Sequence, residues 1–290
     1  MTAGTEYALV AMVFFGLGDW IYRRAARDGV SAHHFLMGQA WLFCPSVVLY
    51  AAATGTLTLA GGAAWGNLAG LFLFLGLLLF ARSLRSGPVS VNGPIFRLGF
   101  VVTVGLAVVV LGEPLTAAKA AGLMLALIAV WLLLGTTGGT ASGAATFGRS
   151  PTSRRSLLEV LLATVLAGIG YFCHKLGTAA GAAPSTLVAA QAMVFASLAT
   201  LLTATMERSL RWPPGLWRHA VPAAVVLIAA FLFFVHALGS GPASVVVPIA
   251  QMGFVPASVL GIVIGGEPLT VRKGLGLAVA LAALALLAWG

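Results

Sequence analysis

The chain has 290 residues, of which 60% are hydrophobic and only 8% charged, and its net charge at pH 7 is +9. Globular domains carry about 25% charged and about 45–50% apolar residues. This composition excludes a water-soluble protein and indicates one that crosses a membrane many times. The positive charge does not indicate a nucleic-acid partner, because the basic residues lie between the apolar segments, where they meet lipid headgroups.

Ten apolar segments follow one another, each close to the roughly 20 residues that a membrane-spanning helix requires. We therefore expect an all-α integral membrane protein with ten transmembrane helices. They are predicted at 6–22, 33–53, 64–83, 88–111, 115–135, 157–177, 184–206, 219–238, 242–265 and 270–289. One long connection, 136–156, is rich in Gly, Ser and Thr and is predicted to be a flexible linker. It divides the chain into two five-helix units, 1–135 and 157–290.

The two units repeat each other. Residues 86–135 match residues 240–289 at a shift of 154 without a gap, with 25 identities in 50 positions, and the beginnings of the units align at a shift of 152. Because five spans is an odd number, the second unit lies upside down relative to the first. Inverted repeats of this kind build transporters in which two related halves surround a shared central site.

The lysines and arginines distinguish the two ends of the spans. Thirteen of the sixteen lie in connections that follow an odd-numbered span, two lie in the other connections, and Arg97 lies inside a span. Cytoplasmic loops carry the excess of positive charge. The distribution predicts both termini outside. With no targeting segment evident, we expect a multi-pass protein of a bacterial cytoplasmic membrane.

Each half carries the same five-residue turn, G-E-P-L-T, between its fourth and fifth span, at 112–116 and 266–270. Together with the five-plus-five arrangement, this turn resembles the drug/metabolite transporter superfamily, EamA type, over essentially the whole chain. The resemblance implies a ten-helix exporter or exchanger of metabolites, amino acids or nucleotide sugars, with a cavity lined by both halves. It also implies cytoplasmic termini, which conflicts with the charge distribution.

The residues of this turn have a structural interpretation, which we favour over proton coupling or substrate contact. Gly112 and Gly266 would end one helix, Pro114 and Pro268 would begin the next, and the acids would complement its positive dipole end. The acids are Glu113 and Glu267.

Arg97 is the sharpest candidate for a substrate site, because an ionisable side chain inside a membrane is costly. Its repeat equivalent is Gln251, so the fold does not require the charge. In a cavity, Arg97 would bind a carboxylate or phosphate through two parallel hydrogen bonds. The alternatives are a structural ion pair with Asp19, or snorkelling. Asp19 is itself a candidate substrate or proton site, or an interfacial acid neutralised by Arg23.

The remaining candidates are polar or aromatic residues in the spans. Those predicted to line a substrate cavity, with packing as the alternative for each, are Asn92, Gln39, Gln191, Gln251, Trp20 and Phe96. His174 and His236 join Asp19 as candidates for proton coupling, with interfacial anchoring as the alternative. Pro94 and Pro248 occupy equivalent positions and predict bends in the fourth and ninth spans.

We therefore expect a secondary transporter that moves a small anionic or zwitterionic metabolite by alternating access. A multidrug or cation exporter and a lipid flippase are the alternatives. An intramembrane enzyme is disfavoured because no nucleophile–base pair, metal-ligand cluster or pair of carboxylates is evident. No ATP-binding motif indicates the use of ATP. No cofactor and no metal are expected. The expected partners are a small solute and the lipid bilayer, with protons and a second copy of the chain as further alternatives.

Overall fold

In a computed structural model, the described part of the chain, which omits residues 1–2, 59–61, 85–86, 135–153, 209 and 290, contains twelve α-helices and no strand. The predicted all-α class, with two inverted five-helix repeats, is confirmed. The helices are α1 (Ala3–Arg27), α2 (Ala32–Ala53), α3 (Ala63–Ser83), α4 (Val89–Arg97), α5 (Gly99–Leu111), α6 (Ala117–Leu134), α7 (Arg154–Ala179), α8 (Pro184–Glu207), α9 (Leu216–Ser240), α10 (Ala243–Gln251), α11 (Phe254–Val263) and α12 (Val271–Trp289). The predicted linker 136–156 lies outside the described residues as far as 153.

Twelve helices replace the ten predicted because the fourth and ninth spans each break in the middle. The breaks lie at Leu98, between α4 and α5, and at Met252–Gly253, between α10 and α11. Each break comes four residues after the proline that predicted a bend, so the prolines lie inside α4 and α10. At both breaks the backbone tightens to bonds three residues apart: Leu98 N–H donates to Ile95 at 3.0 Å and Met252 N–H to Ile249 at 3.1 Å.

A glycine from the opposite half of the protein packs against each break. Gly16 of α1 lies against Gly253, and a Cβ atom on Gly16 would stand 2.5 Å from the Gly253 carbonyl oxygen. In the same way, a Cβ atom on Gly168 of α7 would stand 2.6 Å from the Gly99 carbonyl oxygen. Only glycine permits backbones to approach this closely. The first helix of each half therefore crosses the broken helix of the other half at its break.

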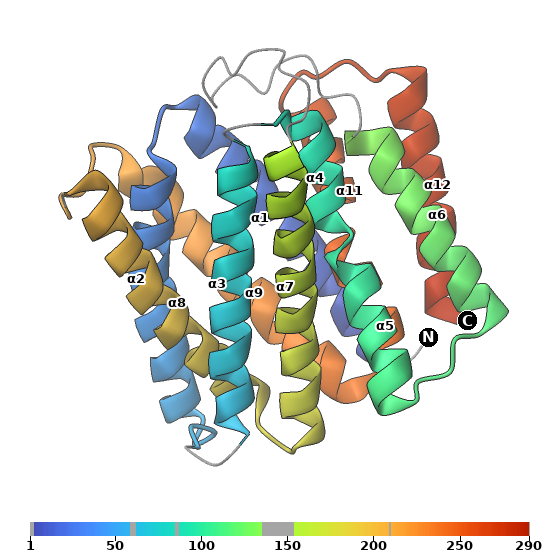
Figure 1. The fold of residues 1–290 in the computed structure, drawn as a ribbon, viewed down its shortest axis with the longest axis horizontal. Helices are drawn as coiled ribbons and strands as arrows, with labels where there is room; N and C mark the ends of the chain where they lie inside the picture. The colour runs from blue at the N-terminus through green and yellow to red at the C-terminus, as the bar shows by residue number, and fades with distance from the viewer. Residues whose placement is uncertain (1–2, 59–61, 85–86, 135–153, 209, 290) are drawn as a thin grey trace.

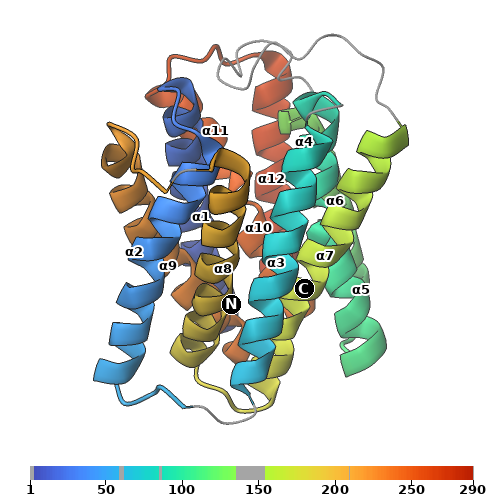
Figure 2. The same ribbon diagram turned by 60° about the vertical axis from the view of Figure 1, so that its left-hand side comes forward.

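The helices pair across the two halves in a reciprocal pattern. The most extensive contacts join α1 to α9 and α3 to α7, and since α7 and α9 are the repeat equivalents of α1 and α3, these are the same pair seen twice (Figures 1 and 2). The equivalent helices α2 and α8 also pack together, as do α6 and α12. The two halves therefore share one core. It contains Phe100, Phe234 and Phe254, each at most 1% exposed.

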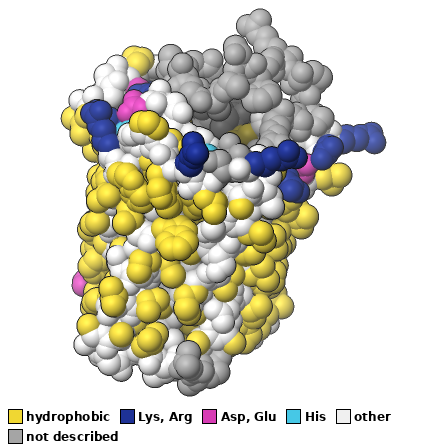
Figure 3. Space-filling model, turned by 90° about the vertical axis from the view of Figure 1, so that its left-hand side faces the viewer, with side chains coloured by type: hydrophobic (Ala, Val, Ile, Leu, Met, Phe, Trp, Pro, Cys, Tyr) yellow, Lys and Arg dark blue, Asp and Glu magenta, His cyan; other side chains and the backbone are white. Residues whose placement is uncertain are grey.

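The surface matches a protein embedded in a bilayer. In the described chain, nine segments have the length and composition to cross a membrane, and α1, of 25 residues, is the tenth long helix. Figure 3 shows the basic side chains in a band near one end, above a largely apolar surface. The two termini lie toward the opposite end (Figure 1). We call the end with the basic band the basic face, and the other end the terminal face.

Candidate functional site

The intramembrane charges form a pair within the first half, between its first helix and its broken fourth span. Asp19 of α1 and Arg97, the last residue of α4, make a hydrogen-bonded ion pair, with 27% and 26% of their side chains exposed. Arg97 stands beside the break in the fourth span, where the chain leaves the helical path. A charge pair in a membrane is costly unless both partners are satisfied and water has access. The partial exposure shows that neither side chain is fully enclosed by the protein.

A second, uncharged pair occupies the equivalent position in the other half. Asp19 corresponds to Tyr171 at the shift of 152, and Arg97 corresponds to Gln251 at the shift of 154. The side chains of Tyr171 and Gln251 lie close enough to interact, and both Asp19 and Arg97 lie close enough to act electrostatically on the Tyr171 hydroxyl. Polar side chains from the equivalent positions of the two halves therefore lie near one another around Tyr171.

Two further pairs repeat the same symmetry. The Tyr22 hydroxyl donates to the Gln39 side-chain oxygen, and at the equivalent position His174 Nε2 lies 2.6 Å from Gln191 Oε1. Because that oxygen is an acceptor, His174 carries its proton on Nε2. His174 is fully buried, and its Nδ1 has no hydrogen-bond partner among the residues that the structure describes. The two glutamines each join the first helix of a half to the second.

The tyrosines at these positions were not among the sequence candidates. Tyrosine is an uncharged residue type at neutral pH, so the presence of a charge within a span does not select it. The signal that would have found them is the alignment of the two halves. It places Tyr171 opposite Asp19 and Tyr22 opposite His174.

Other candidates lie apart from this cluster. His236 is exposed on α9, where its Nδ1 bonds the Leu232 carbonyl at 2.8 Å. Phe96 stacks on Phe80 with ring centroids 4.3 Å apart. Trp20 carries the Arg24 guanidinium 5.6 Å from its ring centre and lines a depression of about 320 Å³ on the basic face.

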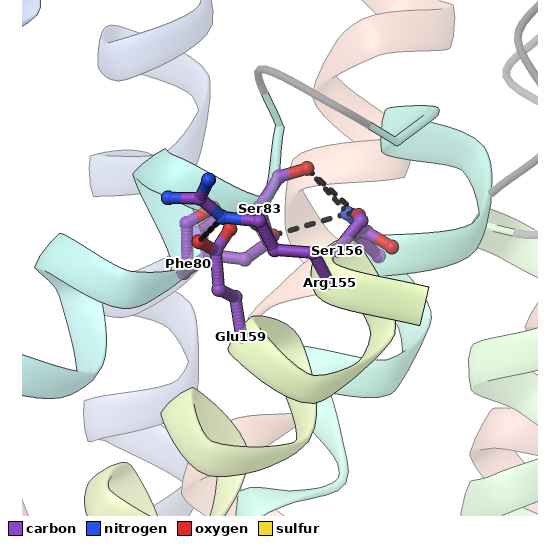
Figure 4. A network of polar contacts seen from close by, with 6 residues as sticks. Phe80, Ser83, Arg155, Ser156 and Glu159 are labelled. Atoms are coloured by element: carbon purple, nitrogen blue, oxygen red, sulfur yellow. Dashed lines mark hydrogen bonds and ion pairs between the residues drawn. The ribbon is translucent and has the colours of Figure 1, made fainter. Parts of the chain in front are cut away.

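Asn92 is committed to a hydrogen-bonded network that holds α4 to α3 and α7. Its side-chain nitrogen donates to the Ser83 carbonyl at 3.0 Å and to the Ser156 hydroxyl at 2.9 Å, and the side chain is fully buried. Figure 4 shows this network, together with the neighbouring Arg155–Glu159 ion pair on α7. These contacts fasten the first turn of α4, so we leave Asn92 out of the substrate site.

The G-E-P-L-T turn of the first half contacts the second half. Gly112 ends α5 with a φ of +66°, in the left-handed region. The two carboxylate oxygens of Glu113 accept hydrogen bonds from Ala243 N–H and Ser244 N–H, both at 2.8 Å, at the start of α10. The sequence interpretation, that Glu113 complements the helix that follows it, is therefore corrected: the side chain caps a helix of the opposite half. An isolated turn could not reveal this, because the contact spans 130 residues.

The equivalent turn makes a different set of contacts. Glu267 accepts a hydrogen bond from Lys273 Nζ at 2.9 Å, and its other oxygen lies 3.7 Å from Arg27. Partial burial acts to raise the pKa of Glu267. The Lys273 hydrogen bond and the charges of Lys273, Arg23 and Arg27 outweigh that burial and leave this pKa below the ordinary glutamate value. Among the described contacts of Glu267, none is with α4.

The short helices that carry the central residues differ in burial. Every residue of α10 is buried, and α10 packs against α1, α5 and α9 in the centre of the bundle (Figure 2). The side of α4 that includes Gly93 and Arg97 is partly exposed. Among the residues that the structure describes, α4 makes at most marginal contact with α11, although the equivalent α10–α5 contact is extensive. We call the terminal face, where α10 is buried, the closed face, and the basic face, where α4 is partly exposed, the open face.

Inverted halves, helices broken at mid-span and polar side chains near the breaks are features of many membrane transporters. The chain belongs to the EamA-like transporter family, whose model matches residues 2–135 and again 154–289. The resemblance to the drug/metabolite transporter superfamily is thereby confirmed, and the protein is a multi-pass membrane transporter of a family that consists of transporters rather than enzymes.

The chain is also similar to a solved structure titled "Crystal structure of protein". The TM-score is 0.78, the identity is 19%, and the alignment covers 99% of each chain. At this identity the likeness shows the fold alone. No curated protein matches the chain.

Proposed function

We propose that this protein carries a small zwitterionic or anionic metabolite across the cytoplasmic membrane of a bacterium by alternating access, with Arg97 and Asp19 as its substrate ligands. The observation that carries this proposal is the partly exposed Asp19–Arg97 ion pair, which lies beside the helix break that ends α4. Residues that served only to hold the fold would not need a charge, since the equivalent pair is Tyr171 and Gln251.

The chemistry of the pair favours a zwitterion over a simple ion. A substrate carboxylate would bind the Arg97 guanidinium through two hydrogen bonds, and a substrate ammonium would take the place of Arg97 beside Asp19. Neither protein charge would then be left unpaired in the membrane. A simple anion would leave Asp19 without a partner, and a simple cation would leave Arg97 without one, at a cost of several kcal/mol.

The experiment is an efflux assay with purified protein in liposomes loaded with amino acids, organic acids, cationic dyes and a labelled lipid, with and without a pH gradient. We expect efflux of a zwitterion or anion by the wild type. Arg97→Gln, which installs the residue of the other half, should reduce it by about 100-fold or more. Arg155→Gln is the matched control, because Arg155 is 83% exposed and pairs on the surface with Glu159.

The other outcomes identify the alternatives. Efflux of cationic dyes alone would contradict the zwitterion proposal and favour a multidrug exporter with Asp19 as its ligand. Transfer of labelled lipid alone would indicate a flippase. Unchanged efflux in Arg97→Gln would assign the ion pair to structure, and a dependence on the pH gradient would identify protons as the coupling ion.

The orientation in the membrane is part of the proposal. We place the basic face in the cytoplasm, because cytoplasmic loops carry the excess of Lys and Arg. The open face then faces inward and both termini lie outside. A cysteine or epitope at either terminus should react with impermeant reagents on intact cells, and protection of both termini would reverse the orientation.

A further inference from the structure

The two motif glutamates are equivalent in sequence but not in their contacts. Glu113 lies on the terminal face and caps α10 through the Ala243 and Ser244 amides. Glu267 lies on the basic face, and its described contacts are with Lys273 and Arg27 rather than with α4. At the shift of 154, the amides equivalent to those of Ala243 and Ser244 belong to Val89 and Ser90, at the start of α4. On the closed face Glu113 caps the short helix α10. On the open face, the described contacts of Glu267 do not include the short helix α4.

The lysine that follows each glutamate changes its partner accordingly. Lys273 donates a hydrogen bond to Glu267, whose described contacts do not include α4. The equivalent Lys119 is buried and donates instead to the Pro114 carbonyl at 3.1 Å, while Glu113 caps α10. Of the two lysines, Lys273 therefore pairs with its own glutamate, and Lys119 bonds a backbone carbonyl instead.

A second basic residue in each half follows the same pattern. Lys175 donates to the Leu238 and Gly241 carbonyls, at 2.9 and 2.8 Å, at the connection that leads into α10. Its repeat equivalent, Arg23, instead lines the depression on the basic face with Glu267. On the closed face the connection is thus held at both its amide and its carbonyl groups. On the open face the equivalent residues, Arg23 and Glu267, line the same depression.

We propose that Glu113 and Glu267 are the two gate residues of the transport cycle, each closing one face by capping the short helix of the opposite half. In the opposite state, Glu267 leaves Lys273 and accepts from the Val89 and Ser90 amides, while Glu113 leaves α10 and pairs with Lys119. The positive dipole end of each short helix attracts the carboxylate when the faces meet. This inference rests on alternating access in the proposed function, but not on any substrate.

The test measures which face is open by the reactivity of two equivalent cysteines in detergent. Gly93→Cys lies on the open side of α4, where a Cβ atom meets nothing within 4 Å. Val247→Cys lies at the equivalent place on α10, where the side chain is fully buried. Each is made in a background in which Cys44 and Cys173 are replaced by Ala, and is labelled with a maleimide. In the wild type we expect fast labelling at 93 and slow labelling at 247.

The two gate variants should shift these rates in opposite directions. Glu113→Gln weakens the cap of α10 and should raise labelling at 247 about tenfold, with a fall at 93. Glu267→Gln removes the cap that α4 needs in the opposite state and should lower the residual labelling at 247 about tenfold, leaving 93 reactive. The matched control is Glu6→Gln, which makes the same charge change at an exposed position on α1 and should change neither rate.

Opposite shifts would establish the gates, because a merely structural role predicts shifts in one direction at both probes. Unchanged rates in both variants, or a rise at 247 in both, would overturn the proposal. If Glu113→Gln does not fold, Glu267→Gln decides alone, since Glu267 is partly exposed and pairs near the surface. The assay contains no substrate, so a failed efflux assay and a failed gate remain distinguishable.

Discussion

α4 and α10 occupy equivalent positions in the two halves, yet they lie in different environments. Of the span that contains α10, 78% is buried, against 28% for the span that contains α4. Both helices start after a Gly-Pro pair, contain a proline at the equivalent place and end at a break pressed by a glycine from the other half. The helices therefore begin, bend and end alike, and they differ in their burial and in the side chains between those points.

This comparison gives a physical account of alternating access. If one set of contacts closes the terminal face around α10, the pseudosymmetry supplies an equivalent set to close the basic face around α4. The two arrangements need similar free energies, because a transporter must visit both. The predictions below test which contacts belong to both states and which belong to one.

The glycine crossings should carry the largest effect, since they are common to both halves. In Gly168→Ala and Gly16→Ala the new methyl group would meet a carbonyl oxygen of the opposing backbone at 2.6 and 2.5 Å. We expect each to lower the free energy of unfolding in detergent by about 3 kcal/mol. Gly105→Ala is the control, because its Cβ atom meets nothing within 4 Å, and it should be neutral or slightly stabilising. A large effect at only one crossing would contradict their equivalence.

Exchanging residues between α4 and α10 tests their difference directly. Val247→Gly removes a fully buried side chain and adds backbone freedom, and should cost about 2 kcal/mol by denaturant titration. The reciprocal Gly93→Val places a side chain in open space and should change stability by less than about 0.5 kcal/mol. Equal costs for the two exchanges would mean that α4 is packed as tightly as α10.

The network at the start of α4 should contribute less. Asn92 has Val246 as its repeat equivalent, so Asn92→Val makes the two halves alike at this position. The variant loses the bonds to Ser83 and Ser156, but the Ser156 hydroxyl keeps its own bond to the Ser83 carbonyl at 2.9 Å. We therefore expect a loss of about 1 kcal/mol in thermal unfolding, and unchanged efflux. A loss of efflux with normal stability would return Asn92 to the substrate site.

Much of this architecture follows from the sequence, because hydropathy and the internal repeat are patterns that extend over the whole chain. Ten segments, two halves, their inversion and the basic face all follow from residue type and spacing. The Asp19–Arg97 pair was among the alternatives for the same reason. The helix breaks lie four residues beyond Pro94 and Pro248, where glycines of the opposite half pack, and this contact has no local signal in the sequence. The sequence could not assign Glu113 to α10, since a cap formed across 130 residues has no local signal.

The smallest expected effect concerns how the stability that Glu267 contributes depends on pH. The pKa of Glu267 is below the ordinary value because of Lys273, so the folded state binds this proton less readily than the unfolded chain. The stabilisation is therefore present above the ordinary pKa of glutamate and is lost as the pH falls through the folded pKa. Since the pair is partly exposed, we expect only about 0.5 kcal/mol between wild type and Glu267→Gln at pH 7, narrowing to zero at acidic pH. Thermal unfolding between pH 7 and pH 3 measures this difference, and Lys273→Met should abolish it. A difference that persists at pH 3 would mean that Glu267 is held by uncharged contacts, as a gate already closed on α4 would be.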